Sequence, residues 1–294
     1  MKDIKTSDNY SIWLANYDMP LISNAGYNSF READQLNWHY HDCYELTFVT
    51  HGSAVWEMEN DKLVHTFRNQ VSLMQPNTKH RGADNITLPC EMYWIVFNPK
   101  KDGAIYNTTF TEEEMKRLDD VFMQKGNAVF SITKNVNCIL EEIKEIINSA
   151  NKTFDEMLVR SYLRSLVCQL IASVAQCALD DQEEFSSEDV AYICQYIEAN
   201  YNREITAREL ADLIDKKETY VYGIFKEVLG QSPKEYLQRI RISKTIELLK
   251  STGKSITDIA LESGFSNSQY FSKVFSRYMG VSPSQYRKSN QKAN

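Results

Sequence analysis

The stretch that decides the fold runs from Ser255 to Arg287 and reads SITDIALESGFSNSQYFSKVFSRYMGVSPSQYR. An earlier segment carries the same pattern, and its matching positions lie 50 residues upstream. The matching pairs are Tyr220 and Tyr270, Phe225 and Phe275, Gly230 and Gly280, Ser232-Pro233 and Ser282-Pro283, and Tyr236 and Tyr286. Leu210-Ala211 matches Ile259-Ala260 at a distance of 49, so one copy has a turn that is one residue longer. We therefore expect two copies of one supersecondary unit.

Each copy has the residue pattern of a helix, a tight turn and a second helix. In the later copy, Ser255 and Asp258 form a capping pattern before a short helix, and the small Ala260 lets another helix cross closely. Gly264 suits the turn, and Gly280 lies where a helix end needs a left-handed residue. Two such helix-turn-helix units could place two recognition helices in successive segments of the DNA major groove, ~34 Å apart.

The later copy resembles the signature of AraC/XylS-type transcription regulators, with matching residues at fixed spacing from Ile256 to Arg287. With the first copy and the segment Tyr236-Leu237-x-Arg239-Ile240-Arg241, the resemblance covers residues 188 to 288. It implies an all-α domain that binds double-stranded DNA through two recognition helices. The residues that the resemblance places in the major groove are Thr219, Tyr222, Ser268, Gln269, Ser272 and Lys273.

The chemistry of these side chains suits DNA contact. Gln269 offers a paired donor and acceptor edge for adenine, and Lys273 suits guanine. Arg277 and Arg287 are better candidates for phosphate than for bases. The alternative for each polar residue is a solvated helix face with no DNA role.

The first copy departs from the family pattern at three positions. Gly223 stands where the family has Arg, Lys217 stands where a Ser or Thr cap is usual, and Asp215 replaces the turn glycine. Asp215 and Glu218 form an alternative capping pattern. Whether this copy reads bases directly is therefore open, and Tyr222 or DNA shape could contribute instead.

Residues 1 to 110 have the pattern of an antiparallel β domain. Short runs rich in β-branched and aromatic residues, at 45–49, 54–58 and 92–97, are separated by turn-forming residues. Many short strands at this spacing indicate a sandwich or a small barrel.

The histidines of this domain suggest a binding site. His39, His41 and Glu45 follow the spacing H-x-H-x3-E, and His80 comes after Pro76. This resembles the two cupin motifs, which in metal-binding members supply three histidines and a glutamate, and such ligands suit Zn, Fe, Mn or Ni. A glycine expected before Pro76 is absent and His80 comes one residue early, so we expect no metal and no cofactor.

We expect these groups to line an effector pocket in a cupin-like barrel instead. Trp38, Trp56 and Tyr93 are candidate apolar walls, and a carbohydrate is the candidate effector because sugars stack on aromatic rings between polar groups. His51 and His65 have no matching spacing and are expected at the surface. The predicted effector contacts are Arg31, His39, His41, Glu45, His80 and Trp94.

The predicted domain organisation has four parts. Residues 1–110 form the effector-binding domain, and 111–179 form a helical connector with two long amphipathic helices. The polar residues 180–187 are a linker, and 188–294 form the DNA-binding domain. The apolar stripes of the connector helices explain equally well a hairpin packed within one chain or a contact in a homodimer.

The net charge of −7, from 33 basic and 40 acidic residues, seems to argue against DNA binding. Division of the chain removes the objection. Residues 1–186 carry 17 basic and 27 acidic side chains, whereas residues 187–294 carry 16 basic and 13 acidic ones. No acidic residue follows Glu262, but five basic residues do. The end of the chain that carries the second recognition helix is therefore purely basic.

The sequence thus predicts a cytoplasmic transcription regulator that is not an enzyme. No apolar run approaches the ~20 residues of a membrane helix, and the N-terminus lacks a secretory pattern. The six cysteines show no CxxC pairing, which favours reduced thiols. RNA polymerase is a further candidate partner. The alternatives are a metal-dependent cupin enzyme fused to a DNA-binding domain, and a regulator controlled by a protein partner.

Overall fold

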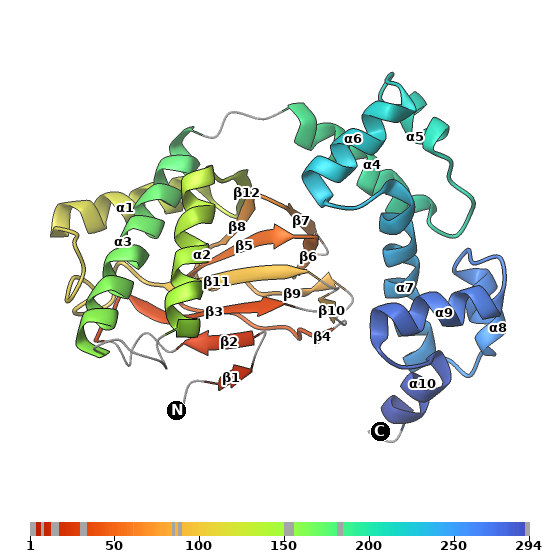
Figure 1. Ribbon diagram of the computed structural model, residues 1–294, viewed down its shortest axis with the longest axis horizontal. Helices are drawn as coiled ribbons and strands as arrows, with labels where there is room; N and C mark the ends of the chain where they lie inside the picture. The colour runs from red at the N-terminus through yellow and green to blue at the C-terminus, as the bar shows by residue number, and fades with distance from the viewer. Residues whose placement is uncertain are drawn as a thin grey trace.

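The computed structural model of the chain divides into an N-terminal β domain covered by helices and a C-terminal helical domain (Figure 1). The segments that the structure describes are 4–6, 9–12, 18–29, 34–60, 62–83, 86–87, 90–149, 156–180 and 185–291.

The β domain contains a seven-stranded antiparallel sheet in the order β1-β2-β3-β11-β5-β8-β12. A three-stranded sheet, β7-β6-β9, and the pair β10-β4 complete it. The strands are β1 (Ile4–Thr6), β2 (Asn9–Ile12), β3 (Ile22–Ser29), β4 (Asp34–Gln35), β5 (Tyr44–His51), β6 (Ser53–Met58), β7 (Leu63–Phe67), β8 (Gln70–Met74), β9 (His80–Gly82), β10 (Ile86–Thr87), β11 (Glu91–Phe97) and β12 (Ala128–Ser131).

The predicted fold class, an antiparallel β domain followed by a helical domain, is confirmed, although the described strands form separate sheets and not a closed barrel. The chain changes sheet between β5 and β6 at Gly52, whose φ of 76° only glycine adopts readily. β5 therefore stays in the large sheet, and β6 pairs with β7 and β9 in the small one.

The large sheet has one face on helices and one face on the small sheet. On β5, Leu46 and Phe48 point toward the helices and join the main core. Val49, on the opposite face, packs in a smaller core with Trp56 and Met58 of the small sheet. The period of two along the strand thus produces two cores from one β sequence.

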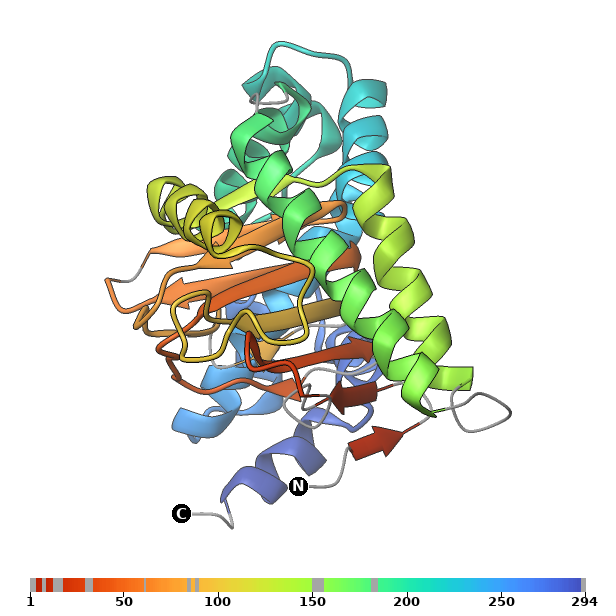
Figure 2. The same cartoon turned by 90° about the vertical axis from the view of Figure 1, so that its left-hand side faces the viewer.

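Three helices cover the outer face of the large sheet (Figure 2). They are α1 (Glu112–Lys125), α2 (Lys134–Ser149) and α3 (Glu156–Asp180). Thr111 and Glu114 form a reciprocal capping box at the start of α1, as its sequence indicates. The apolar stripe of α3, which includes Leu163, Leu170 and Val174, is buried in the core of its own chain.

The segment 111–179 is therefore more than a helical connector, since β12 within it pairs with β8 at the edge of the sheet. Residues Met157–Asp180 are long and apolar enough to cross a membrane by length and composition alone, in contrast to the sequence-based expectation. The buried side chains of this helix pack on the sheet, as those of a core helix do. Of the predicted linker, residues 181–184 lie outside the described residues, and α4 begins at Phe185.

The C-terminal domain contains the two predicted helix-turn-helix units. Its helices are α4 (Phe185–Asn200), α5 (Ala207–Leu213), α6 (Glu218–Leu229), α7 (Pro233–Ser251), α8 (Ile256–Glu262), α9 (Ser268–Met279) and α10 (Pro283–Gln291). One turn of α7 contributes Tyr236 and Ile240 to the core around α5 and α6, and the next contributes Ile242 and Ile246 to the core around α8 and α9. A single helix thus belongs to both units (Figure 1).

The turns of both units contain a residue in the left-handed backbone conformation, but the residue differs between them. Gly264 has φ 83°, and Asp215 adopts the left-handed conformation at φ 52° in the matching place. The predicted capping role of Asp215 is wrong, because Lys217 is the N-cap of α6 and makes no side-chain cap bond. Of these two turn positions, only 264 requires a glycine, because an added Cβ there would lie 2.7 Å from the carbonyl oxygen of Tyr201.

We predict that Gly264→Ala lowers the free energy of unfolding by at least about 2 kcal/mol, because left-handed strain adds to a backbone clash. Gly253→Ala is the matched control, since nothing lies within 4 Å of its added Cβ. Urea unfolding followed by helical circular dichroism measures both. Equal urea midpoints for the two variants would contradict this account of the turn.

Candidate ligand pocket and nucleic-acid interface

The inner face of the large sheet carries polar side chains around one indole. Trp94 on β11 lies directly across from Thr47 on β5, and Thr47 lies across from Ser72 on β8. The neighbouring inner positions on β3 are Asn24 and Asn28, across from Val96 and Met92. Cross-strand partners share a face, so these groups lie opposite the helix-covered side.

The four histidine-motif residues are brought together at the end of this face. Glu45 Oε2 lies 3.1 Å from His80 Nε2 and 3.4 Å from His41 Nε2. A backbone bridge between residues 39 and 80 holds His39 beside them, with ring centroids 4.2 Å apart. Trp56 meets His80 edge-on from the small sheet. The site therefore depends on contacts between strands that are far apart in the sequence.

Hydrogen bonds define the protonation of this cluster. His80 Nδ1 donates to the carbonyl oxygen of Thr78, so its Nε2 can also donate to Glu45 only as an imidazolium. Burial opposes the charged form, but the Glu45 carboxylate outweighs it and raises the pKa of His80. Burial likewise opposes charge on Glu45, yet hydrogen bonds from His41 and His80 lower its pKa to about 2.

The pKa of His39 is shifted in the opposite direction from that of His80. Burial lowers the pKa of His39, and its Nδ1 donates to the carbonyl oxygen of Asn37. A neutral ring held in this way presents Nε2 as an acceptor. The cluster therefore combines an ion pair with an acceptor nitrogen, which suits a ligand that has hydroxyl groups.

The same cluster has side chains of the types that bind metal ions. His39, Glu45 and His80 each offer one ligand atom, and these atoms lie within 4.8 Å of one another. Backbone acceptors for the Nδ1 atoms of His39 and His80 are the kind of support that metal-ligating histidines have. These residues could hold a divalent transition metal, although the ion pair with His80 already balances the charge of Glu45 without one.

The other predicted effector residues have different positions. Trp94 is on the inner face, half-buried, whereas Arg31 lies outside the described residues. Tyr93, expected as a pocket wall, points to the other face, where its ring contacts Tyr27 at a tilted angle and its hydroxyl donates to Glu141 of α2. Trp38 lies under Arg81, with 4.7 Å from the guanidinium carbon to the ring centroid.

Sequence reasoning missed the polar inner residues Asn24, Asn28, Thr47 and Ser72. The signal was present for Thr47 and Ser72, because each is a polar residue between apolar neighbours of a buried strand. That these four residues share one face of the sheet follows only from the strand register. His51 is exposed as expected, with a partner in Glu91, but the prediction that His65 is a surface residue is wrong. Its side chain is 10% exposed and lies 3.5 Å from Glu198 of α4.

In the C-terminal domain, α6 and α9 occupy equivalent positions as the second helices of the two units. Thr219 and Tyr222 on α6 are exposed, as are Gln269 and Lys273 on α9. Ser268 and Ser272 are half-buried. Asn267 caps α9 by accepting from the Tyr270 amide at 2.8 Å, so the first turn of this helix is well fixed.

The groove between the two units is about 590 Å³ in volume and is lined by both Tyr222 and Tyr270. Gln238 of α7 lies at its base and donates to the Tyr270 hydroxyl. Arg277, predicted to contact phosphate, donates to Gln238 at 2.9 Å. Arg277 is thus oriented by α7, and its guanidinium retains donors for a further acceptor.

Comparison with known proteins assigns the chain to a family. A family model described as an AraC-like ligand binding domain matches residues 29–167. A model described as a helix-turn-helix domain matches residues 210–289. The first match includes Trp94, Thr47, Ser72 and the histidine cluster, and the second includes both recognition helices.

Three relatives match most of the chain. The melibiose operon regulatory protein of Escherichia coli (strain K12) is 38% identical over 86% of this chain and 84% of the relative. The Msm operon regulatory protein of Streptococcus mutans is 31% identical over 85% of this chain and 86% of the relative. The lactose operon transcription activator of Staphylococcus xylosus is 26% identical over 82% of each chain.

The pKa shifts of Glu45 and His80 predict the pH range in which this pair stabilises the fold. A carboxylate with a lowered pKa stabilises the fold above its unfolded value of about 4.5 and loses this effect as the pH falls toward 2. A histidine with a raised pKa stabilises below its unfolded value of about 6.5 and loses this effect as the pH rises through its folded pKa. The pair is therefore most stabilising between these two unfolded values.

We predict that Glu45→Gln costs more unfolding free energy at about pH 5.5 than at about pH 8.5. Urea titrations of wild type and variant at both values, with a chelator present, measure the difference. Glu114→Gln is the control, because that exposed capping residue has no histidine partner. A Glu45→Gln cost that is the same at both pH values would contradict the ion pair.

Proposed function

The chain belongs to the AraC family of DNA-binding transcription regulators, and on this basis we propose that its effector is a carbohydrate. The observation that carries the proposal is the inner face, where Trp94 lies among the hydroxyl and amide groups of Thr47, Asn24 and Asn28. An indole provides a flat apolar surface, and polar neighbours provide directional hydrogen bonds.

The histidine cluster adds groups that sugar hydroxyls can use. Glu45 is an acceptor, His41 is partly exposed beside it, and neutral His39 offers its Nε2. We assign the effector contacts to Trp94, His39, His41, Glu45 and His80, together with Arg31 from the sequence. Relatives named for the melibiose and lactose operons support a saccharide.

The DNA contacts of the proposal are Thr219, Tyr222, Ser268, Gln269, Ser272, Lys273 and Arg277. Gln269 and Lys273 read bases from the second unit, because they are exposed on α9 one helical turn apart. Tyr222 contributes from the first unit, where the adjacent Gly223 leaves the helix surface open. Arg277 binds phosphate while it remains tied to Gln238.

The partners of the regulator are part of the proposal. It acts in the cytoplasm, as a homodimer that contacts RNA polymerase when it is bound to a promoter. The exposed apolar residues Met157, Leu158 and Tyr162 at the start of α3 support a subunit contact there. Its role is regulation and not catalysis.

We predict that melibiose, raffinose or lactose raises the melting temperature of the protein in a concentration-dependent way, because a ligand of the native state stabilises it by mass action. At 100 times its dissociation constant the stabilisation is about 2.7 kcal/mol. Trp94→Ala abolishes the shift, and Tyr106→Ala, at an exposed aromatic residue away from the inner face, leaves it intact. No shift with any of the three sugars, or a shift that survives Trp94→Ala, would contradict the site.

We also predict that Gln269→Ala with Lys273→Ala weakens specific promoter binding about a hundredfold, since each good base contact is worth ~1–3 kcal/mol. Fluorescence anisotropy with promoter and scrambled duplexes measures specificity, and a rise in salt should weaken both complexes. The matched control is Lys116→Ala with Gln124→Ala, two exposed residues of α1. Promoter affinity that matches wild type in the α9 variant would refute the assignment.

A further inference from the structure

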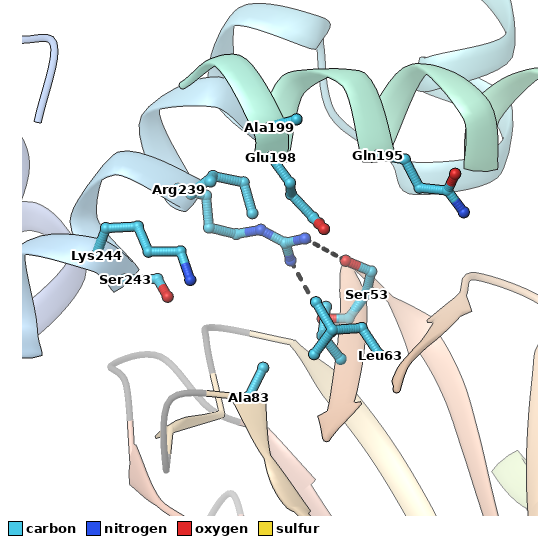
Figure 3. A pocket seen from close by; sticks show the side chains of 11 residues that line it. Ser53, Leu63, Ala83, Gln195, Glu198, Ala199, Arg239, Ser243 and Lys244 are labelled. Carbon is cyan, nitrogen blue, oxygen red and sulfur yellow. Dashed lines mark hydrogen bonds between the residues drawn. The ribbon is translucent and has the colours of Figure 1, made fainter. Parts of the chain in front are cut away.

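The second recognition helix, α9, is joined to α7 through the side chain of Gln238. This side chain is only 8% exposed, and its amide bonds two residues of α9. The amide oxygen accepts from Arg277 Nη2 at 2.9 Å, and the amide nitrogen donates to the Tyr270 hydroxyl. The next residue, Arg239, instead donates to Ser53 of the β domain (Figure 3). The hydrogen bonds of Gln238 thus hold α9, whereas those of Arg239 hold the β domain.

Arg277 fixes the direction of both hydrogen bonds of Gln238. A guanidinium has five N–H donors and no acceptor, so the atom of Gln238 that faces it must be the amide oxygen. The amide nitrogen therefore faces Tyr270, and the hydroxyl oxygen of Tyr270 accepts from it. The hydroxyl proton of Tyr270 consequently points away from Gln238.

The Tyr270 proton has no acceptor among the residues that the structure describes. Tyr270 is 38% exposed and lines the groove between the two units, together with Glu204 and Arg241. Arg241 has no acceptor to offer, and no hydrogen bond joins Tyr270 to Glu204 in the described part of the chain. Tyr270 therefore presents a hydrogen-bond donor to whatever occupies this groove.

The matching tyrosine of the first unit uses its proton within the protein. Tyr220 precedes Tyr270 by 50 residues and has the equivalent place on α6. Its hydroxyl donates to Asp189 of α4 at 2.9 Å. Of these two matching tyrosines, only the one on α9 has its donor directed to the groove.

The place of Tyr270 on α9 suits contact with a phosphate. It directly follows Gln269, and successive residues of a helix point about 100° apart. With Gln269 at the base edges, Tyr270 faces the side of the major groove, where the phosphate backbone runs, and tyrosine is one of the side chains that bind phosphate oxygens. Because hydrogen bonds in a chain polarise one another, the cation of Arg277 strengthens the donor at the far end.

We propose that Tyr270 donates a hydrogen bond to a DNA phosphate, and that Gln238 is the positioning residue that directs the Tyr270 proton to it. The contact rests on the proposed placement of α9 in the major groove. It increases affinity for any duplex, because a phosphate carries no sequence information. Base readout by Gln269 and Lys273 is a separate contribution.

Tyr270→Phe keeps the ring, which meets Phe265 edge-on, and removes only the hydroxyl. We expect it to weaken promoter and scrambled duplexes by the same factor, about tenfold, because a hydrogen bond to a charged acceptor is lost. The slope of log K against log salt should keep its wild-type value, since no cation is removed. Fluorescence anisotropy with the full chain measures both quantities. Tyr220→Phe is the matched control and should bind both duplexes as wild type does.

Duplexes with a single neutral methylphosphonate locate the contact. At one phosphate beside the site of α9, the substitution should weaken wild-type binding and have little effect on the Tyr270→Phe variant, because the two changes remove the same hydrogen bond. At phosphates that Tyr270 does not contact, both proteins should lose affinity equally.

Gln238→Met tests the positioning role, since it nearly conserves the volume of this buried side chain and removes both hydrogen-bonding groups. It should weaken both duplexes, and in its background the effect of Tyr270→Phe should fall from about tenfold to about twofold or less. A Gln238 that only fills space would leave the effect of Tyr270→Phe unchanged. Circular dichroism melts show that each variant is folded at the temperature of the binding assay.

Three results would overturn the proposal. One is wild-type affinity of the Tyr270→Phe variant for both duplexes, and another is a loss confined to the promoter duplex, which would make the contact one to a base. The third is an equal effect of Tyr270→Phe with and without Gln238. Base readout is measured by the Gln269→Ala, Lys273→Ala variant through the ratio of promoter to scrambled affinity, so the two proposals fail separately.

Discussion

Helix α7 is the constraint on which the arrangement of this protein depends. It is one continuous helix of 19 residues, which at 1.5 Å per residue is about 28 Å long. Its first half is part of the core of one helix-turn-helix unit, and its second half is part of the core of the other. Because one continuous helix belongs to both units, it fixes the positions of α6 and α9 relative to each other. Any signal that reaches α7 therefore reaches both recognition helices.

The β domain contacts this helix through the same small sheet that faces the histidine cluster. β6 presents Trp56 toward His80 on one side, while Ser53 at its start accepts from Arg239 of α7. Phe67, at the end of β7, packs in the core of the first helix-turn-helix unit. An effector that shifts β6 would change its contacts with α7, and this coupling requires that the ligand prefer one arrangement over the other.

The charged residues are distributed unequally between the two domains. The acidic excess belongs to residues 1–186, and the basic C-terminal segment belongs to the second unit. Buried charges are compensated in different ways. Glu45 has two histidines, and Glu198 has His65, Tyr236 and the nearby charge of Arg239. Arg239 also donates to the oxygens of Ser53 and lies over the Tyr236 ring.

Most local features could be predicted from the sequence. Capping residues such as Thr111 and Ser232, the helix-ending Gly230 and Gly280, and the period of α3 act over a few residues, so their consequences can be read directly. The two helix-turn-helix units followed from the repeat for the same reason. The opening of the cupin-like barrel into separate sheets and the burial of His65 could not be predicted, because each depends on how separate segments meet.

Local sequence patterns specify which elements form, the duplicated DNA-binding unit and the residue types at the effector and DNA sites. Three features follow only from the folded arrangement: Trp94 shares a face with Thr47, Tyr93 faces the helices, and Arg239 is buried against Ser53. The difference lies in how far apart along the chain the interacting residues are. Helix caps and periodicity are set by neighbours along the chain, whereas strand register and domain docking depend on contacts between residues up to 186 positions apart, as Arg239 and Ser53 are.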